Sequence, residues 1–382
     1  MSVTAHVPAL AALFAARRGD ILADLERLVT HESPSDDPAL VSELARWIAG
    51  RLGEEGVSAE RVTCAGRGDA VRARWGREGG TLLLGHLDTV WPAGTLAELP
   101  FRVEDGVAKG PGIFDMKGGI AVALAVLSAV GRGEVRPARG LSLLLTPDEE
   151  VGSGASRELL VGEARRHERV LVLEPAGEGG AAKVARKGVG QVTVRFRGLA
   201  AHAGLEPEKG ASALLEMARF LLYAEALSDS HIGTSIVPTL ARAGSKANVV
   251  PEAADLTVDF RAWTTAEVER VEHAFRTYRG RDPRVVVEVE GGLNRPPMEP
   301  TDASMELYRS AASLAERLGF ELPSARVGGA SDGNLTAAAG VPTLDGLGPS
   351  GGGAHARTEH VALEDLPRRA ALLAALLSEV PA

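Results

Sequence analysis

The sequence predicts an α/β fold in which a three-layer α/β/α domain contains an inserted ferredoxin-like α+β domain. Three apolar runs in the first half, TLLLGH, GLSLLLT and RVLVLEP, do not alternate with polar residues and are separated by helical patterns. This is expected of strands in a sheet that is covered on both faces. Beyond Lys187 the strands do alternate, as in a sheet with one covered face. The 382 residues also exceed one ordinary core.

The elements of the α/β part follow from the spacing of apolar residues. We expect helices at about 8–29, 37–55, 118–133, 153–167, 304–319 and 366–380. We expect strands at about 58–63, 70–75, 81–86, 140–146, 169–175 and 341–348.

The inserted part has a different order of elements. Between them, the segments GVGQVTVRFRG and RVVVEVEGG enclose a helix, two strands and a second helix. The order strand-helix-strand-strand-helix-strand is that of a ferredoxin-like domain. We expect it to occupy 187–296, so that the larger domain is discontinuous and comprises 1–186 and 297–382.

Composition excludes several classes of protein. The net charge of −9 and the lack of a basic block argue against a nucleic-acid partner. Cys64 is the one cysteine, which excludes an intrachain disulfide and a cysteine-based zinc site. We expect no run of apolar residues that spans a membrane. A signal peptide has its positive charges before its apolar segment, whereas Arg17 and Arg18 follow the first apolar patch, so we expect a cytoplasmic location.

Acidic residues and histidines follow the predicted strands. Ligands of open α/β sheets gather beyond the carboxyl ends of the strands. One such ending is unremarkable, but five on one edge of a sheet point to a site, because crowded carboxylates repel one another and divalent cations relieve that repulsion. Two histidines and three carboxylates are enough for two cations with one bridging carboxylate. The residues are His86 and Asp88; Asp115; Asp148, Glu149 and Glu150; Glu174; and His355.

These segments resemble the M20 family of zinc peptidases, and within it the bacterial glutamate carboxypeptidases. The resemblance runs along nearly the whole chain, and its motifs are GHLDTVW, GPGIFDMKGG, TPDEEVGS, LEPA, GLAAHAG, NVVPEAADLTVDFRA, VGGASDGN and GGGAHARTEHV. It implies that the larger domain is catalytic, that the inserted domain mediates homodimerisation, and that each subunit binds two Zn²⁺. Manganese or cobalt would fit the same hard ligands.

The resemblance also implies a role for each site residue. The metal ligands would be His86 and Glu174 on one zinc, Glu150 and His355 on the other, and Asp115 between them. Glu149 would be the general base and Asp88 would orient His86. Asp148 fits no ligand role and is expected in a turn; Met116 is not a ligand.

The inserted domain would supply the remaining groups. The resemblance implies that His202 stabilises the oxyanion in the partner subunit, and that Asn248 and Arg261 hold a free substrate carboxylate, with Arg295 as a further candidate. In the larger domain, Arg368 and Arg369 of the helix expected at 366–380 are expected on a solvated face.

The implied reaction is hydrolysis of the amide bond before a C-terminal amino acid such as glutamate, with a small peptide or N-acyl amino acid as substrate. The residues hardly distinguish this from an N-acyl-amino-acid deacylase. A non-catalytic binding protein on the same fold is a third reading, and the presence of Glu149 and Asp115 argues against it.

Overall fold

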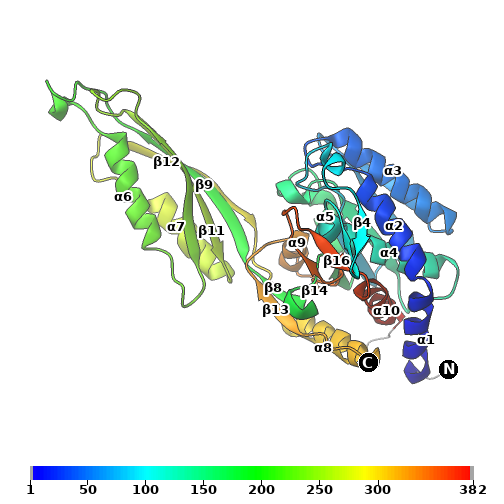
Figure 1. The fold of residues 1–382 in the computed structure, drawn as a ribbon. Helices are drawn as coiled ribbons and strands as arrows, with labels where there is room; N and C mark the ends of the chain where they lie inside the picture. The colour runs from blue at the N-terminus through cyan, green and yellow to red at the C-terminus, as the bar shows by residue number, and fades with distance from the viewer. Residues whose placement is uncertain (1–2, 379–382) are drawn as a thin grey trace. The chain divides into compact units, whose positions relative to one another are not determined.

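The computed structural model describes residues 3–378, and the chain divides into two compact units (Figure 1). The smaller unit comprises Arg186–Glu299 and Gly328–Ala330, and the rest of the chain forms the larger one. The expected limits of the insertion, 187 and 296, lie one and three residues inside the main segment of the smaller unit.

A six-stranded mixed sheet forms the centre of the larger unit. Its strand order is β1-β2-β6-β3-β7-β14. The four strands from β6 to β14 are parallel to one another, whereas β2 is antiparallel to β6 and to β1. The bounds are β1 (Ala59–Cys64), β2 (Gly68–Trp75), β3 (Thr81–His86), β6 (Leu141–Thr146), β7 (Arg169–Val172) and β14 (Thr343–Leu344).

Helices cover both faces of this sheet and give three layers. Leu83 and Leu143 of the sheet share one core cluster with residues of α1–α4, α8 and α10. Leu82 and Leu144, one residue away on each strand, belong to a second cluster with residues of α5 and α9. The period of two along a strand explains this division. The helices are α1 (Val3–Ala16), α2 (Arg18–Thr30), α3 (Pro38–Glu54), α4 (Gly118–Gly131), α5 (Arg157–Ala164), α8 (Asp302–Arg317), α9 (Asp332–Ala338) and α10 (Asp365–Ser378).

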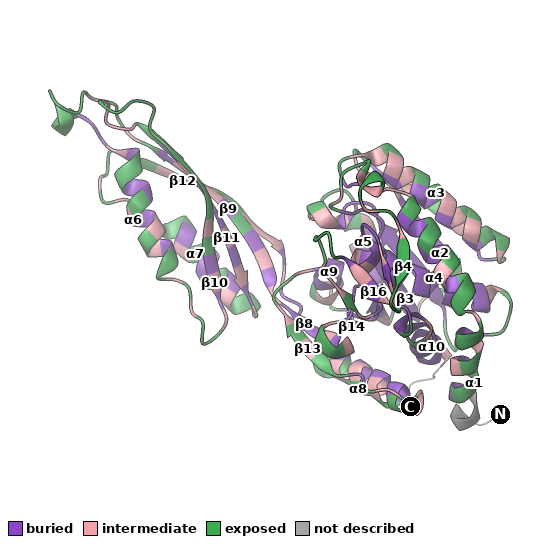
Figure 2. Cartoon of the chain, viewed as in Figure 1, coloured by how far each residue is buried: buried purple, intermediate pink, exposed green. Residues whose placement is uncertain are grey.

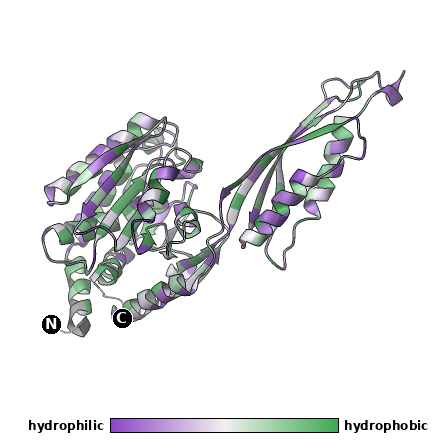
Figure 3. Ribbon diagram, turned by 180° about the vertical axis from the view of Figure 1, so that it is seen from behind, coloured by the Kyte–Doolittle hydropathy of each residue, from purple (hydrophilic) through white to green (hydrophobic). Residues whose placement is uncertain are grey.

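Helix α4 is the core helix of the larger unit. The stretch Ile113–Gly131 is long and apolar enough to cross a membrane by length and composition alone, but 94% of its most apolar window is buried inside the protein. Figure 2 shows α4 largely in the colour of buried residues, and in Figure 3 the strands at the centre of this unit are mainly hydrophobic. Burial by protein on all sides explains the lack of a polar face.

The structure differs from the expectation at both ends of the chain. The helix expected at 8–29 is two helices, α1 and α2, separated at Arg17, whose backbone is not helical. The last two residues of the helix expected at 366–380 lie outside the described residues.

A small antiparallel sheet, not expected as such, has the order β15-β16-β5-β4. Its strands are β4 (Arg102–Glu104), β5 (Val107–Lys109), β15 (Gly351–Gly352) and β16 (His360–Ala362).

The smaller unit has the expected order of elements, β9-α6-β10-β11-α7-β12, in an antiparallel sheet of order β10-β11-β9-β12. Its core is aromatic: Phe220 of α6 packs 5.8 Å from Phe275 of α7, and Phe275 lies 5.9 Å from Phe260 of the sheet. The bounds are β9 (Gly188–Arg197), α6 (Ala213–Glu225), β10 (Ser235–Ala243), β11 (Ala253–Ala262), α7 (Thr265–Thr277) and β12 (Val286–Arg295). A separate two-stranded sheet pairs β8 (Ala182–Arg186) with β13 (Ser324–Val327).

Candidate metal centre

The polar residues that follow three neighbouring parallel strands meet at one edge of the larger sheet. His86 is the last residue of β3, Glu150 lies in the turn after β6, and Glu174 comes two residues after β7. Because β6, β3 and β7 are adjacent and parallel, their carboxyl ends lie side by side. The sheet topology therefore gathers side chains that are far apart in sequence.

Asp115 lies between two imidazole-carboxylate pairs. Its Oδ1 is 3.2 Å from Nε2 of His86, and the same nitrogen is 3.4 Å from Oε1 of Glu174. Its Oδ2 is 3.3 Å from Nε2 of His355, which is 3.2 Å from Oε2 of Glu150. One carboxylate thus presents each oxygen to a different pair. This is the arrangement required for two cations that share one bridging ligand.

Burial differs between the two sides of Asp115. His86 and Glu174 are buried, 2% and 7% exposed. The His355 side chain is 50% exposed, and the backbone φ of His355 is +61°. His355 comes from the glycine-rich loop after β15, whereas His86 belongs to a central strand of the sheet. The His86 side is therefore enclosed and the His355 side is open.

The electrostatics of the site reflect crowded charges. Burial alone would lower the pKa of His86, but hydrogen bonds with Asp115 and two other carboxylates raise that pKa well above its usual value. Hydrogen bonds with Asp115 and Glu150 raise the pKa of His355 to about 10. Burial works against ionisation of Asp115, yet its two imidazole partners bring its pKa below the usual range.

The donor set fits divalent cations. Buried Oε1 of Glu150 has no hydrogen-bond partner among the described residues, and burial raises the pKa of this carboxyl group. A buried carboxylate oxygen without a donor is costly unless a cation occupies its free side. One ligand atom each from His86, Asp115 and Glu150 lies within 4.8 Å of the others, which makes the group a candidate metal site. Imidazole nitrogens and carboxylate oxygens suit zinc, manganese and cobalt.

Asp88 contacts other residues besides His86. Nδ1 of His86 lies 2.9 Å from the backbone oxygen of Asp88 and 3.4 Å from its carboxylate. The carboxylate itself accepts hydrogen bonds from the backbone N–H groups of Glu149 (3.0 Å) and Glu150 (3.1 Å) and from the Ser35 hydroxyl (2.8 Å). Asp88 is fully buried. Its backbone therefore orients the imidazole, and its side chain holds the turn that bears Glu149 and Glu150.

Glu149 and Asp148 occupy the same turn as Glu150. Glu149 begins the short 3₁₀ helix η3 (Glu149–Val151) and is 9% exposed. Asp148 accepts a hydrogen bond from the backbone N–H of Ala155 at 2.7 Å, and its side chain is not among those that face Asp115. This is the turn position expected for it.

Two of the predicted residues of the smaller unit are neighbours in its backbone. His202 pairs with Val249 in an isolated β-bridge, and the N–H of Ala203 donates to the backbone oxygen of Asn248 at 2.9 Å. Both His202 and Asn248 are exposed. Nδ1 of His202 accepts the N–H of Gly204 at 3.1 Å, which leaves Nε2 as the nitrogen that can donate.

The two predicted arginines of the smaller unit flank one residue of β9. Arg261 on β11 and Arg295 at the end of β12 both pair with Val189. The Arg261 guanidinium donates to Oδ1 of Asp259 at 3.0 Å and to the backbone oxygen of Gly328. Arg295 is 7% exposed. The sheet thus places the two arginines on the two strands that flank β9.

Sequence reasoning missed two buried charged residues of the larger unit. Glu359 is 3% exposed and accepts backbone hydrogen bonds from the segment that bears Asp115. Arg369, expected on a solvated face, is 2% exposed and pairs with Asp365 at 3.0 Å. Asp365 in turn accepts from the N–H and hydroxyl of Ser350, at the start of the glycine-rich loop. Only contacts across the fold distinguish these residues from surface charges.

The fold and the site define a metal-dependent hydrolase. The model of Peptidase family M20/M25/M40 matches residues 82–379, and the chain belongs to this family. It is 32% identical over 374 residues to carboxypeptidase G2 of Pseudomonas sp. (strain RS-16), covering 95% of this chain and 89% of that one. It is also 30% identical over 341 residues to a succinyl-diaminopimelate desuccinylase of Alkalilimnicola ehrlichii, covering 84% and 88%.

A solved structure shares the fold of the whole chain. The YXEP protein of Bacillus subtilis, described as a dinuclear metal-binding peptidase of the M20 family, superposes with a TM-score of 0.71. The match covers 95% of this chain and 98% of that one at 16% identity. The expected family, α/β fold and enzymatic nature are therefore confirmed.

Proposed function

We propose that the protein is a dinuclear metal carboxypeptidase that hydrolyses the amide bond before a C-terminal amino acid with a free carboxylate, with glutamate as the first candidate. The observation that carries this proposal is the position of Asp115, which offers one oxygen to His86 and Glu174 and the other to His355 and Glu150. The similarity to carboxypeptidase G2 along 95% of the chain favours this substrate class.

The five ligands would hold two Zn²⁺ per subunit, with manganese or cobalt as substitutes. Bound divalent cations polarise a carbonyl group and lower the pKa of water towards neutrality. Glu149 would accept a proton from the attacking water and deliver it to the leaving nitrogen. Its neighbour Glu150 binds metal, and the Asp88 carboxylate fixes both backbones, so the base is held beside the ligand.

The smaller unit would recognise the substrate. Arg261 and Arg295 flank Val189, and a pair of guanidinium groups suits a free carboxylate. Asn248 lies next to His202, at the other end of β11 from Arg261, so it would add its amide donor from the partner subunit. His202 would stabilise the oxyanion in the partner subunit of a homodimer. Exposed leucines of this unit support an interface there: Leu205, Leu222 and Leu240 are 75%, 68% and 69% exposed.

A second candidate is an N-acyl-amino-acid deacylase on the same scaffold. The specific observation in its favour is the 30% identity to a desuccinylase, close to the 32% to the carboxypeptidase. Both reactions hydrolyse an amide, so the same metal ligands and the same base would serve either one.

The test combines metal analysis with a substrate panel. The purified protein is assayed for amino-acid release from N-acyl-glutamate, N-acyl-aspartate, neutral N-acyl amino acids and a succinylated diamino acid. We expect about two cations per chain and preferential release of glutamate. Glu149→Gln should lose at least about 100-fold in kcat and keep its metal. Preferred cleavage of the succinylated substrate would favour the second candidate, and wild-type kcat in Glu149→Gln would contradict the role of Glu149.

A further inference from the structure

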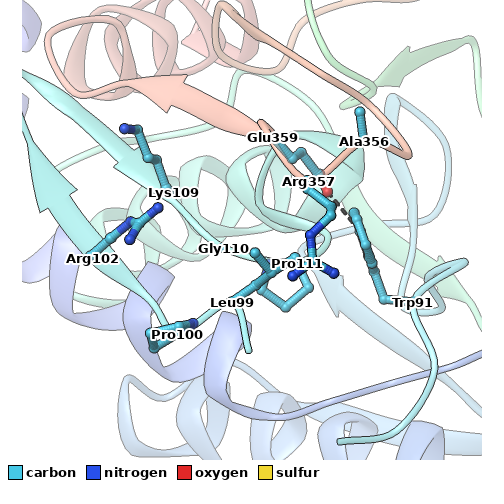
Figure 4. A pocket seen from close by; sticks show the side chains of 10 residues that line it. All are labelled: Trp91, Leu99, Pro100, Arg102, Lys109, Gly110, Pro111, Ala356, Arg357 and Glu359. Carbon is cyan, nitrogen blue, oxygen red and sulfur yellow. Dashed lines mark hydrogen bonds between the residues drawn. The ribbon is translucent and has the colours of Figure 1, made fainter. Parts of the chain in front are cut away.

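The carboxylate of Glu359 accepts hydrogen bonds from the backbone of the segment that bears Asp115. Oε1 accepts the N–H groups of Phe114 (2.8 Å) and Asp115 (3.0 Å). Oε2 accepts the N–H of Gly112 (2.9 Å) and the indole N–H of Trp91 (2.7 Å). Figure 4 shows the contact between Glu359 and Trp91. A carboxylate has about four acceptor positions, and here four donors use them.

The segment needs such an acceptor because its own backbone is irregular. Residues Ile113–Lys117 form a distorted turn before α4, in which Asp115 has φ −114° and ψ 93°, outside the helical range. Ile113 and Lys117 donate to the backbone oxygens of Gly110 and Gly112, whereas Phe114 and Asp115 donate to an acceptor outside the segment. A buried N–H without an acceptor costs free energy, so an acceptor from elsewhere in the fold must replace the missing one. Glu359 supplies it for Phe114 and Asp115 of the turn and for Gly112 just before it.

Glu359 also belongs to the segment that bears the opposite ligand, His355. Its N–H donates to the backbone oxygen of Ala356, which closes a turn just after His355. The next residue, His360, begins β16 and pairs with Lys109 of β5. The side chain of Glu359 therefore joins the His355 segment directly to the Asp115 segment, four residues from one ligand and next to the backbone of the other.

We propose that Glu359 is a positioning residue that fixes the separation of Asp115 and His355, and thereby the affinity of the cation held between them. This inference rests on the proposed metal centre. Oδ2 of Asp115 and Nε2 of His355 lie 3.3 Å apart. Both belong to irregular segments outside the central sheet, whereas His86 is fixed by β3. The cation on the His355 side therefore depends on Glu359 more than the cation on the His86 side.

The decisive variant is Glu359→Gln, which keeps the shape of the side chain. One of the two carboxylate oxygens becomes an NH₂ group. That group faces two N–H donors and cannot accept a hydrogen bond from either of them. Glu98→Gln is the matched control: Glu98 pairs with Arg357 of the same loop, but its side chain is 69% exposed. It removes the same charge without disturbing the backbone of 112–115.

The experiment is a titration of the chelator-treated full-length proteins with Zn²⁺ in competition with a chromophoric chelator. We expect Glu359→Gln to bind the weaker zinc about 10- to 100-fold less tightly, as for other residues that orient ligands. Glu98→Gln should stay within about twofold of wild type, because exposed ion pairs contribute little. The thermal midpoint of each metal-free protein is measured in parallel.

The outcomes separate the two hypotheses. A folded Glu359→Gln protein with wild-type zinc affinity and a lower thermal midpoint would reduce Glu359 to a structural residue and overturn the inference. Failure of the wild-type protein to bind two zinc ions would instead overturn the proposed metal centre. Should Glu359→Gln not fold, Trp91→Phe removes one of the four donors alone; it must then weaken zinc binding, and an unchanged affinity would overturn the inference.

Discussion

The clearest prediction concerns the Asp88 carboxylate, because its contacts define what it does. The family resemblance assigns it to His86, yet the His86 imidazole is nearer to the backbone oxygen of Asp88 than to its side chain. The side chain holds the turn of Glu149 and Glu150. Asp88→Asn leaves the backbone oxygen in place and removes only the negative charge and one acceptor. It therefore separates the two assignments.

The magnitude follows from the three hydrogen bonds. Placed with its oxygen at the Oδ2 position, the asparagine keeps the bonds from Glu150 and Ser35. Its NH₂ group then faces the N–H of Glu149, and that bond is lost. A hydrogen bond to a charged acceptor contributes about 1.5–3 kcal/mol, so the free energy of unfolding should fall by about 2 kcal/mol. Asp88→Ala leaves both buried N–H groups without an acceptor and should cost about 4 kcal/mol.

The assay is urea unfolding of the chelator-treated protein, followed by tryptophan fluorescence. Three of the four tryptophans, Trp47, Trp75 and Trp91, belong to the larger unit, so the signal reports mainly on the unit that contains Asp88. Asp36→Asn is the control, since Asp36 is exposed beside Ser35.

Two results bear directly on the reasoning. An Asp88→Asn protein no less stable than Asp36→Asn would refute the role of the carboxylate in the turn. Loss of kcat with two zinc ions still bound is the expected functional result, because the turn carries Glu149, the proposed base. Loss of the zinc on the His86 side instead would restore the assignment of the carboxylate to the imidazole.

Three further predictions follow from buried or charged groups. Burial, with a contribution from a nearby aspartate, raises the pKa of Cys64 to about 11, so at pH 8 a thiol reagent should modify the native protein about 100-fold more slowly than the urea-unfolded one. Arg369→Ala leaves Asp365 buried without its charged partner and should lower the free energy of unfolding by about 3–5 kcal/mol, measured in urea. Because the pKa of His355 is raised to about 10, its imidazole must lose a proton to bind zinc. Calorimetry in two buffers should detect that proton, and zinc affinity should rise with pH. The same raised pKa stabilises the metal-free fold below about pH 6.5, and this contribution disappears as the pH rises through 10.

The sequence was sufficient where one local pattern determines the structure. The apolar runs that end at His86 and just before Glu149 and Glu174 predicted buried strands, and the polar residues after them predicted the edge at which they meet. Both predictions use periodicity within a few residues, which the sheet preserves.

The rest depends on contacts between distant segments. Glu359 accepts from Phe114, 245 positions away, and in the sequence it is only one more charge between a histidine and a helix. Arg369 stands beside Arg368, and helical periodicity alone did not identify which of the two faces the core. Asp88 was noticed, but its partners lie 61 and 62 residues further on. No local pattern encodes such backbone partners.

The place of the insertion within the chain has a consequence for biosynthesis. His86, Asp115 and Glu174 all precede the smaller unit, and His355 follows it. A ribosome therefore releases the proposed ligands on the His86 side of Asp115 before it makes the smaller unit, and His355, the last proposed ligand, comes only near the end of translation. A chain that stops short of that point lacks one ligand of the proposed pair of cations, so prematurely terminated products should lack any activity that needs both cations.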